Sequence, residues 1–499
     1  MSQAATPNKA RMGVAGLDDV LGGGLARGRS YLLEGSPGTG KTTIAGQFLM
    51  EGAALGETCL YLTLAETEEE LRASAASHGW AFDPLITIAE LVPPDSLLDP
   101  EQAQTLLYSS DLELGETTRA IFEAVQRLNP SRLVLDSLSE VRLLAQSSLR
   151  YRRQLLAMKY FFARNGTTAL LLDDLTTDAL DKTVHSIAHG VIRLEQDAPS
   201  YGAERRRLRV VKYRGQNFRG GFHGFNIDTG GVRVFPRLVA SEHQRSFRRE
   251  QVNTGLAPLD RLFGGGLERG TATLVIGPAG VGKSLLGFQF LHAAVRRGER
   301  AALFVFEEEV SLLRARARAM DLDLAAMEAQ GLLLLRQVDA AEMSPGEFAQ
   351  MVRDEAAVPG TSTVVIDSLN GYQASMAEER DLILHMRELL QYLNRQGIVS
   401  VLTVAQHGLV GDMRAPVDVT YLADTVALLR YFEAFRQVRR AISVIKKRVG
   451  THEDTIREFR ITSHGLELGE PLQDFQGVLT GVPDYAGERA PLLNEPAAP

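Results

Sequence analysis

The sequence has little of what marks secreted, membrane-spanning or nucleic-acid-binding proteins. Its 499 residues contain a single cysteine, Cys59, which excludes an internal disulfide framework. No stretch approaches the roughly eighteen uninterrupted apolar residues of a membrane span, and the first residues, MSQAATPNKARMG, lack the apolar segment of a signal peptide. The formal net charge of −8 gives the whole molecule no electrostatic preference for nucleic acid. We therefore expect a cytoplasmic protein that has neither a membrane nor nucleic acid as a partner.

A glycine-rich segment stands out in what is present. GSPGTGKTT, residues 35–43, follows the apolar run Tyr31–Leu33 and precedes a helical pattern over residues 44–49. In such a loop the glycines let backbone N–H groups point at phosphate oxygens. The lysine supplies positive charge to the terminal phosphates, and the next hydroxyl is offered to Mg²⁺. The segment predicts a phosphate-binding loop between a strand and a helix, with ATP and Mg²⁺ as ligands.

The same segment occurs a second time as GPAGVGKSL, residues 277–285. Lys41 and Lys283 are separated by as many residues as Gly22 and Gly264, each of which begins a run of three glycines. This repeat argues against glycine turns that merely join a strand to a helix, and it indicates two domains of about 230 residues each. The expected ATP-binding residues are Ser36, Gly38, Thr39, Gly40, Lys41, Thr42 and Thr43 in the first copy and Gly280, Val281, Gly282, Lys283, Ser284 and Leu285 in the second.

Apolar runs alternate with helical patterns in both halves, which predicts an α/β fold. After the first phosphate-loop strand we expect strands at 59–64, 132–136, 169–172, 190–194 and 208–213. The second half should have them at 273–276, 301–306, 363–367, 398–404, 425–429 and 441–445. We expect domains at 1–236 and 251–475, joined by a linker at 237–250 that lacks a strong period. The Pro- and Ala-rich end, 476–499, is expected to be a disordered tail.

Acidic residues follow two strands in each half. Asp136 and Asp367 end apolar strands, at the place where phosphate-loop proteins hold Mg²⁺ through its waters. The expected metal-site residues are therefore Thr42, Asp136, Ser284 and Asp367.

A second acidic group supplies candidates for polarising the attacking water. Glu307 and Glu308 directly follow a strand, and the first half has Ala65 and Glu66 at the matching place. The alternative is that these acids only complement a helix dipole. Because acids recur beside both loops, we interpret Glu66, Glu307 and Glu308 as catalytic.

Two basic pairs complete the pattern: Lys212-Tyr213-Arg214 and Lys446-Lys447-Arg448. Together with the tandem loops, the glutamates and the Asp-Ser strand ends, they resemble the KaiC family of double-domain RecA-like ATPases over nearly the whole chain, especially at 441–459. The resemblance implies two tandem RecA-like P-loop NTPase domains, each a mostly parallel twisted sheet flanked by helices. It also implies a homohexameric ring with ATP between neighbours, in which Lys212, Arg214, Lys446 and Arg448 reach the γ-phosphate of the next subunit. Without the family, such a pair would be a surface feature.

The resemblance further implies autophosphorylation of a Ser/Thr pair in the second domain, which falls on Thr420 and Tyr421. Tyr421 departs from the family's small residue, and Ala65 departs from its first glutamate. The tail after Tyr485 lacks the extension through which clock members meet their activator, so a circadian role is not implied.

Three functions remain open from the sequence. The first is an ATP-driven hexamer with Ser/Thr autokinase activity, a signalling or timing device whose protein partner the sequence does not identify. The second is a RecA- or helicase-like motor on DNA, against which the net charge argues. The third is a regulatory scaffold that binds ATP only to hold its ring together.

Overall fold

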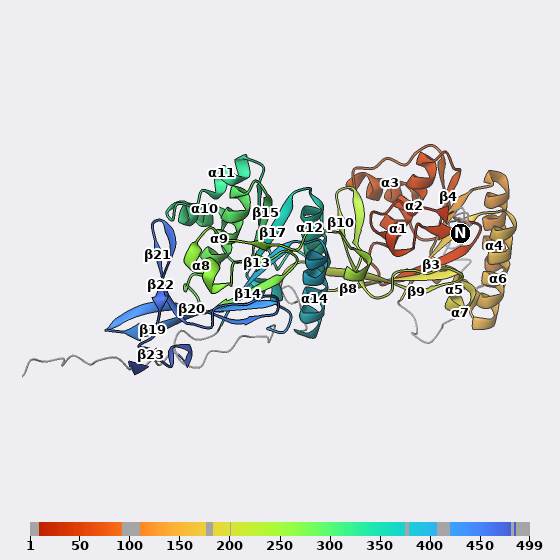
Figure 1. The fold of residues 1–499 in the computed structure, drawn as a ribbon. Helices are drawn as coiled ribbons and strands as arrows, with labels where there is room; N and C mark the ends of the chain where they lie inside the picture. Colours follow the sequence, from red (N-terminus) through yellow and green to blue (C-terminus); the bar gives the residue numbers. More distant parts are fainter. Residues whose placement is uncertain are drawn as a thin grey trace, which may run out of the picture. The chain divides into compact units, whose positions relative to one another are not determined.

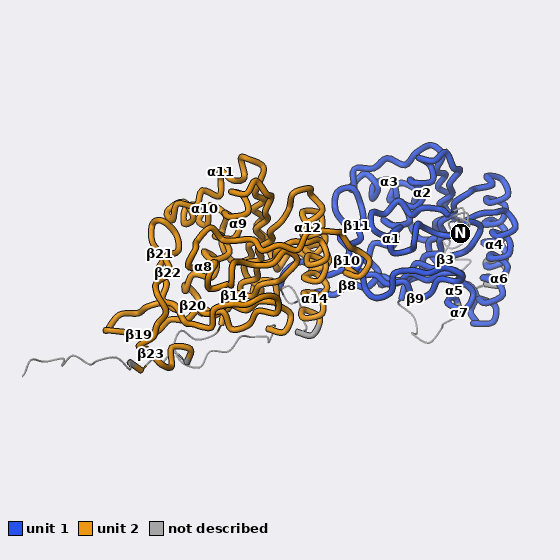
Figure 2. The backbone as a smooth tube through the Cα atoms, in the orientation of Figure 1, with its two compact units in different colours: residues 1–237 blue, residues 238–499 orange. Residues whose placement is uncertain are grey.

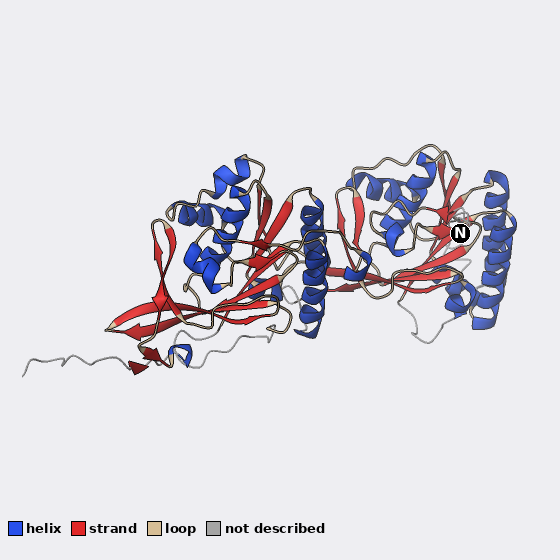
Figure 3. Cartoon of the chain, viewed as in Figure 1, coloured by secondary structure: helices blue, strands red, loops and turns tan. Residues whose placement is uncertain are grey.

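The computed structural model describes residues 9–91, 110–175, 183–199, 201–374, 379–406, 420–480 and 484–485. The chain divides into two compact units, Met1–Arg237 and Leu238–Pro499, shown in blue and orange in Figure 2. Each unit is built on one large sheet with helices on both faces (Figure 3).

The sheet of unit 1 is nine-stranded in the described residues, with the order β11-β10-β9-β8-β3-β7-β6-β4-β5. The strands from β5 to β8 in that order are parallel, and β9, β10 and β11 are added antiparallel to one side. The strands are β3 (Ser30–Gly35), β4 (Cys59–Thr63), β5 (Ile86–Glu90), β6 (Arg132–Asp136), β7 (Thr168–Asp174), β8 (Gly190–Asp197), β9 (Arg205–Tyr213), β10 (His223–Asp228) and β11 (Gly231–Phe235). We call the end where the parallel strands begin the amino end of the sheet, and the end where they finish the carboxyl end.

Unit 2 repeats this topology strand for strand, in the order β16-β15-β17-β18-β14-β19-β20-β21-β22 over its described residues. Its central strand β14 pairs in parallel with β18 and β19, and β20 continues antiparallel from β19. The strands are β14 (Ala272–Gly277), β15 (Arg300–Val305), β16 (Leu333–Gln337), β17 (Thr361–Asp367), β18 (Val399–Ala405), β19 (Thr425–Ala434), β20 (Gln437–Lys447), β21 (Arg457–Thr462) and β22 (Gly465–Pro471).

Helices cover both faces of each sheet (Figure 1). In unit 1 the alternate side chains Leu33 and Tyr61 pack with α1 (Leu17–Val20) and α2 (Lys41–Ala54). On the other face Leu32 and Leu60 pack with α4 (Ser110–Leu128), α5 (Leu138–Ala145) and α6 (Ser148–Arg164). Both faces are thus removed from water, which explains why the central strands are nearly continuous apolar runs. The remaining unit 1 helices are α3 (Glu68–Ser77) and α7 (Thr183–Ile187).

In unit 2 one face carries α8 (Ala257–Leu262), α9 (Lys283–Arg296), α10 (Val310–Arg318) and α11 (Leu324–Ala329). The opposite face carries α12 (Pro345–Ala357), α13 (Leu369–Gln373) and α14 (Glu379–Arg395). Short two-stranded pairings join β1 (Lys9–Ala10) to β2 (Leu25–Ala26) and β12 (Gln251–Val252) to β13 (Leu267–Glu268). None of the helices in the described ranges is long and apolar enough to cross a bilayer.

The fold prediction is confirmed: each unit is an α/β unit with a mostly parallel sheet, and every expected strand is present. Two segments differ from expectation, the linker between the units and the C-terminal tail. The segment 237–250, interpreted as a linker, contains η3 (Ala240–Glu242), and its Leu238 and Ala240 are buried in the core of unit 2. The tail expected to be disordered from 476 is structured further along the chain. There β23 (Phe475–Gln476) pairs with β24 (Asp484–Tyr485), and Val478 in η4 (Val478–Thr480) is buried against Phe432.

Candidate functional site

The phosphate loop of unit 1 lies between β3 and α2, at the carboxyl end of the sheet. Helix α2 begins at Lys41, and its capping residue Gly40 has φ +94°, a left-handed conformation that glycine adopts without strain. An added Cβ at Gly40 would lie 2.5 Å from Ile227 Cδ1, the end of a flexible side chain, so the left-handed backbone is the main reason for glycine here. The loop therefore presents the free backbone N–H groups of a helix N-terminus, which suit an anion such as phosphate.

Lys41 is buried in this loop and fully bonded. Its Nζ donates to the carbonyl oxygens of Gly35 at 2.8 Å and Ser36 at 3.0 Å, and it forms an ion pair with Asp174 Oδ1 at 2.6 Å. Asp174 is the last residue of β7 and was not identified from the sequence. The phosphate-loop lysine of unit 1 is thus already matched by one carboxylate.

Asp136 lies at the end of β6, where the sequence predicts a magnesium ligand. Its Oδ2 accepts from the Tyr61 hydroxyl at 2.6 Å and lies 3.5 Å from Thr42 Oγ1. Burial raises the pKa of Asp136, and the nearby carboxylate of Asp174 raises it further. A buried carboxylate next to a hydroxyl is an all-oxygen donor set in which a cation would favour the ionised form, so these residues fit Mg²⁺.

The loop of unit 2 has the same backbone with a different lysine environment. Gly280 and Gly282 have φ +73° and +117°, and α9 begins at Lys283. Lys283 Nζ donates to the Pro278 carbonyl at 2.8 Å. Burial lowers the pKa of Lys283, while Asp367 and Glu307 act in the opposite sense. Asp367 is also buried and accepts from Thr403 Oγ1 at 2.5 Å.

The acids after the second strand lie beside these aspartates. Leu64 N donates to Asp136 O and Phe306 N to Asp367 O, so the next residues, Ala65 and Glu307, occupy equivalent positions. Glu307 Oε1 accepts from Ser368 Oγ at 3.1 Å.

Glu66 and Glu308 occupy the next position in the two units, and they differ in their charged neighbours. Glu308 pairs with Arg316 at 2.7 Å. Burial raises the pKa of Glu308, and the charge of Asp367 adds to this effect. Burial likewise raises the pKa of Glu66, with contributions from Asp136 and Glu70.

The two Lys-x-Arg pairs lie at the amino end of each sheet and bond to backbone carbonyls there. Lys212 Nζ donates to His185 O and Ala188 O, and Arg214 Nη2 donates to Ser186 O at 2.7 Å. Burial lowers the pKa of Lys212, and the neighbouring charges of Arg214 and Lys159 lower it further.

Unit 2 repeats these bonds around the proposed phosphorylation site. Lys446 Nζ donates to Thr420 O and Ala423 O, each at 2.9 Å, and Arg448 Nη2 donates to Tyr421 O at 2.8 Å. The side chains of Thr420 and Tyr421 are exposed. The predicted phosphosites and the Lys-x-Arg pair of unit 2 therefore lie together, away from the phosphate loop of the same unit.

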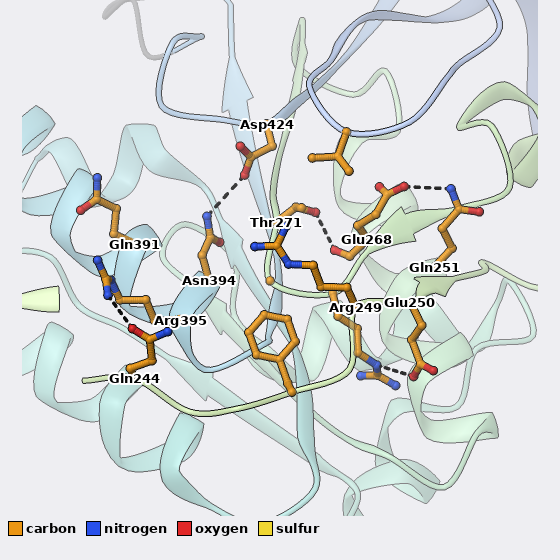
Figure 4. Close-up of a pocket in the computed structure, with 14 residues that line it drawn as sticks. Gln244, Arg249, Glu250, Gln251, Glu268, Thr271, Gln391, Asn394, Arg395 and Asp424 are labelled. Carbon is orange, nitrogen blue, oxygen red and sulfur yellow. Dashed lines mark hydrogen bonds and ion pairs between the residues drawn. The ribbon is translucent and has the colours of Figure 1, made fainter. Parts of the chain in front are cut away.

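A cavity of about 630 Å³ opens beside this turn in unit 2 (Figure 4). On one wall Asn394 Nδ2 donates to Asp424 Oδ2 at 3.3 Å, and Asp424 Oδ1 in turn lies 3.5 Å from Arg448 Nη1. Three arginines and three carboxylates line the cavity: Arg249, Arg269, Arg395, Glu250, Glu268 and Asp424. Since these charges balance, the cavity does not offer the positive field that phosphate groups need, and the candidate phosphate-binding sites are the loops at the carboxyl ends of the sheets.

The structure brings the loop lysines, the aspartates and the glutamates of each unit to one end of its sheet, as the sequence predicts. Among the other loop residues, Thr39 Oγ1 donates to Ser36 O at 2.8 Å and Thr43 faces His78 at 3.5 Å. Val281 and Leu285 are buried in the core, so they could contact a nucleotide only through their backbone. Sequence reasoning missed Asp174, Tyr61 and Thr403, whose only signal is a polar residue in or just after a predicted strand. Ser368, noted in the sequence as part of an Asp-Ser strand end, donates to Glu307.

Comparison with known proteins gives the family. The family model described as "ATPase: KaiC" matches residues 10–239 and again residues 252–473. The circadian clock protein KaiC3 of Synechocystis sp. is 28% identical over 489 residues, covering 96% of this chain and 95% of its own length. The circadian clock oscillator protein KaiC of Thermostichus vulcanus is 29% identical over 483 residues, covering 94% and 90%. That of Synechococcus elongatus is 29% identical over 488 residues, covering 95% and 92%. With two family matches that coincide with the two phosphate-loop units, this chain belongs to the KaiC ATPase family.

Proposed function

We propose that the chain forms a homohexameric ring that binds and hydrolyses Mg·ATP between neighbouring copies, and that unit 2 also acts as a Ser/Thr autokinase. The proposal rests on the opposite placement of the phosphate loop and the Lys-x-Arg pair within each unit. The loop follows the central strand at the carboxyl end of the sheet, and the basic pair lies at the amino end.

The strand register gives the separation. Lys212 is level with Val191, which is level with Leu32 on the central strand, three residues before Gly35. Arg214 lies two residues further toward the amino end, so about 16 Å of strand separates it from the start of its own loop. Unit 2 has the same register, through Lys446, Val426 and Leu274. Neither arginine side chain can span that distance, which supports a ring in which each nucleotide meets the Lys-x-Arg pair of a neighbouring copy.

The residues at each carboxyl end suit phosphoryl transfer. Thr42 and Asp136 in unit 1, and Ser284 and Asp367 in unit 2, would hold Mg²⁺, which when bound supplies positive charge to the phosphate oxygens. Lys41 and Lys283 bind the terminal phosphates, and Glu307 and Glu308 orient and deprotonate the attacking group in unit 2. Glu66 takes this role alone in unit 1. The guanidinium groups of Arg214 and Arg448 stabilise charge on the phosphoryl group as it transfers.

The position of Thr420 supports the proposed autokinase activity. Because Thr420 lies at the amino end beside Lys446 and Arg448, the interface that brings these cations to a neighbour's nucleotide also brings the threonine hydroxyl there. Tyr421 is the weaker acceptor, since its ring holds the oxygen further from the backbone. Relatives named as circadian clock proteins support a signalling or timing role, which would involve a protein partner.

Mixing two inactive variants tests the shared site. Lys283→Ala removes the ammonium group that binds the terminal phosphates. Arg448→Ala removes the guanidinium group proposed to act on the nucleotide of the neighbouring copy. Each variant alone should therefore lose ATP turnover in unit 2. Mixed rings should regain part of it, because some interfaces then combine an intact loop with an intact arginine. Arg460→Ala is the matched control, since Arg460 is an exposed arginine of the same unit with its own surface ion pair. Absence of recovery, in rings shown to exchange subunits, would exclude the trans arrangement.

Phosphopeptide mapping after incubation with Mg·ATP tests the kinase activity. We expect phosphate on Thr420, loss of most labelling in Thr420→Val, and little on Tyr421. Hydrolysis of ATP without phosphate at either residue would leave an ATPase that is not an autokinase. In parallel assays, stimulation by single-stranded DNA would favour the motor, and binding without hydrolysis would favour the scaffold.

A further inference from the structure

The two phosphate-loop lysines differ in the charge beside them. Lys41 forms a 2.6 Å ion pair with Asp174, which is 28% exposed. In unit 2, over the residues that the structure describes, Lys283 donates a hydrogen bond to the Pro278 carbonyl. Its interactions with the charges of Asp367 and Glu307 are electrostatic and act at longer range.

Strand register identifies the position in unit 2 that corresponds to Asp174. Gly35 of β3 is level with Asp174 of β7, and Gly277 of β14 is level with Ala405 of β18. The backbone is held alike at both places, since Asp174 N donates to Ser139 Oγ and Ala405 N to Asn370 Oδ1. The two units therefore share the backbone arrangement at this position, and only unit 1 has a carboxylate there.

The neighbouring acids of unit 1 have other partners. Asp173 pairs with Arg142, and Glu34 pairs with both His185 and Arg193. Asp174 is thus the acid of this group that is directed at the phosphate loop.

The ion pair competes with a bound nucleotide. A lysine ammonium has three N–H donors, and those of Lys41 are taken by Gly35, Ser36 and Asp174. A γ-phosphate that uses Lys41 must displace the carboxylate and then lie close to it, with Asp136 also near. Two like charges a few Å apart in a partly buried site repel strongly. A nucleoside diphosphate places less negative charge beside Asp174 and Asp136, so it is repelled less.

We propose that Asp174 is a specificity-determining residue of the unit 1 site, which lowers the affinity of that site for nucleoside triphosphate relative to diphosphate. Unit 2, with Ala405 at the same place, lacks this discrimination. The inference rests on the proposed function, since it assumes that unit 1 binds nucleotide through Lys41.

Reciprocal substitutions test it in the full-length chain. Asp174→Asn is made with Lys283→Ala, so that only unit 1 binds nucleotide, and Ala405→Asp is made with Lys41→Ala, so that only unit 2 does. Equilibrium dialysis with labelled Mg·ATP and Mg·ADP gives each affinity. We expect Asp174→Asn to increase the affinity of unit 1 for ATP about tenfold and to change its affinity for ADP less. Ala405→Asp should decrease the affinity of unit 2 for ATP by a similar factor. Asp173→Asn is the control in unit 1, and Ala405→Asn is the uncharged control in unit 2.

The outcomes separate this inference from the proposed function. Unchanged or weaker ATP binding in Asp174→Asn would overturn the competition, as would equal changes for ATP and ADP. Normal affinities with reduced turnover would assign Asp174 to the attacking water instead and would also overturn it. If unit 1 binds no nucleotide either with or without Asp174→Asn, the proposed function of that unit fails as well. A weakening by Ala405→Asn equal to that by Ala405→Asp would show a steric effect and contradict the charge argument.

Discussion

Restoring the missing glutamate in unit 1 tests the catalytic role of the acids. Ala65 occupies the position that Glu307 has in unit 2, and its side chain is exposed. In unit 2 the Ser368 hydroxyl holds Glu307 at 3.1 Å, and Ser137 follows Asp136 in the corresponding place in unit 1. A glutamate introduced by Ala65→Glu therefore has a hydroxyl partner in position to orient it.

The expected size of the effect follows from general base catalysis. A positioned base contributes about 10²- to 10⁴-fold to a rate. Since Glu66 remains and the new side chain is placed less well than an evolved one, we expect about a tenfold gain in turnover, or ~1.4 kcal/mol of transition-state stabilisation. Stability should change by less than about 0.5 kcal/mol, because position 65 is exposed. The position also lies just before the first turn of α3, where a negative charge is favourable.

The assay is steady-state ATP hydrolysis at saturating Mg·ATP in a Lys283→Ala background, where only unit 1 turns over. Glu307→Gln in a Lys41→Ala background is the reciprocal measurement and should reduce turnover. If Ala65→Glu is silent while Glu307→Gln is damaging, a group other than the missing glutamate limits unit 1. If both are silent, the acids after the second strand only complement helix dipoles and our interpretation is wrong.

Three further predictions concern single side chains. Lys41→Ala and Lys283→Ala should each abolish nucleotide binding in one unit only, because the ammonium binds the terminal phosphates; unchanged occupancy, measured by chromatography of released nucleotide, would contradict this. Asp136→Asn should abolish Mg²⁺-dependent turnover in unit 1 yet leave the nucleotide-free protein at least as heat-stable, because burial raises the pKa of Asp136 and so disfavours its ionised form in the folded state. A clear drop in the melting temperature would refute that reasoning. His385, whose Nδ1 lies 2.5 Å from the Tyr372 hydroxyl, has a pKa lowered by burial to about 4, so the folded state binds fewer protons than the unfolded one. The free energy of unfolding should fall by on the order of 3 kcal/mol as the pH falls from about 6.5 to about 4. Urea unfolding of His385→Gln should lack this pH dependence.

The centre of each sheet could be predicted from the sequence, and its margins could not. Strands β6 and β17 are buried on both faces, so their sequences are apolar runs that end in an aspartate. The missed strands β5, β10, β11, β16, β21 and β22 lie at the margins of the sheets. Strand β10 reads HGFNID and β21 reads REFRIT, with glycine, asparagine or charged residues on an exposed face. Such residues are typical of turns, and only pairing with a neighbouring strand makes these segments extended.

The candidate sites divide in the same way. The phosphate loops are contiguous in sequence, so their glycines, lysines and hydroxyl residues could be identified directly. Tyr61, Asp174 and Thr403 come from other strands and reach the aspartates or the lysine only when the sheet forms. The Lys-x-Arg pairs were recognised from a family resemblance, and the register of β9 and β20 places each pair at the opposite end of the sheet from the phosphate loop of its own unit.

The internal repeat separates what the scaffold requires from what each site does. Both units have the same strand order, and in both the lysine of the Lys-x-Arg pair donates to backbone carbonyl oxygens of the segment that precedes a parallel strand. At the carboxyl end, unit 1 has Ala65 and Asp174 where unit 2 has Glu307 and Ala405. Unit 1 thus has one acid after its second strand, Glu66, where unit 2 has two, Glu307 and Glu308, and it also has a carboxylate paired with the phosphate-loop lysine. Both differences act against hydrolysis of a triphosphate in unit 1, the first by removing a base and the second by opposing the γ-phosphate. If the two sites share one chemistry, unit 2 should therefore account for most of the turnover.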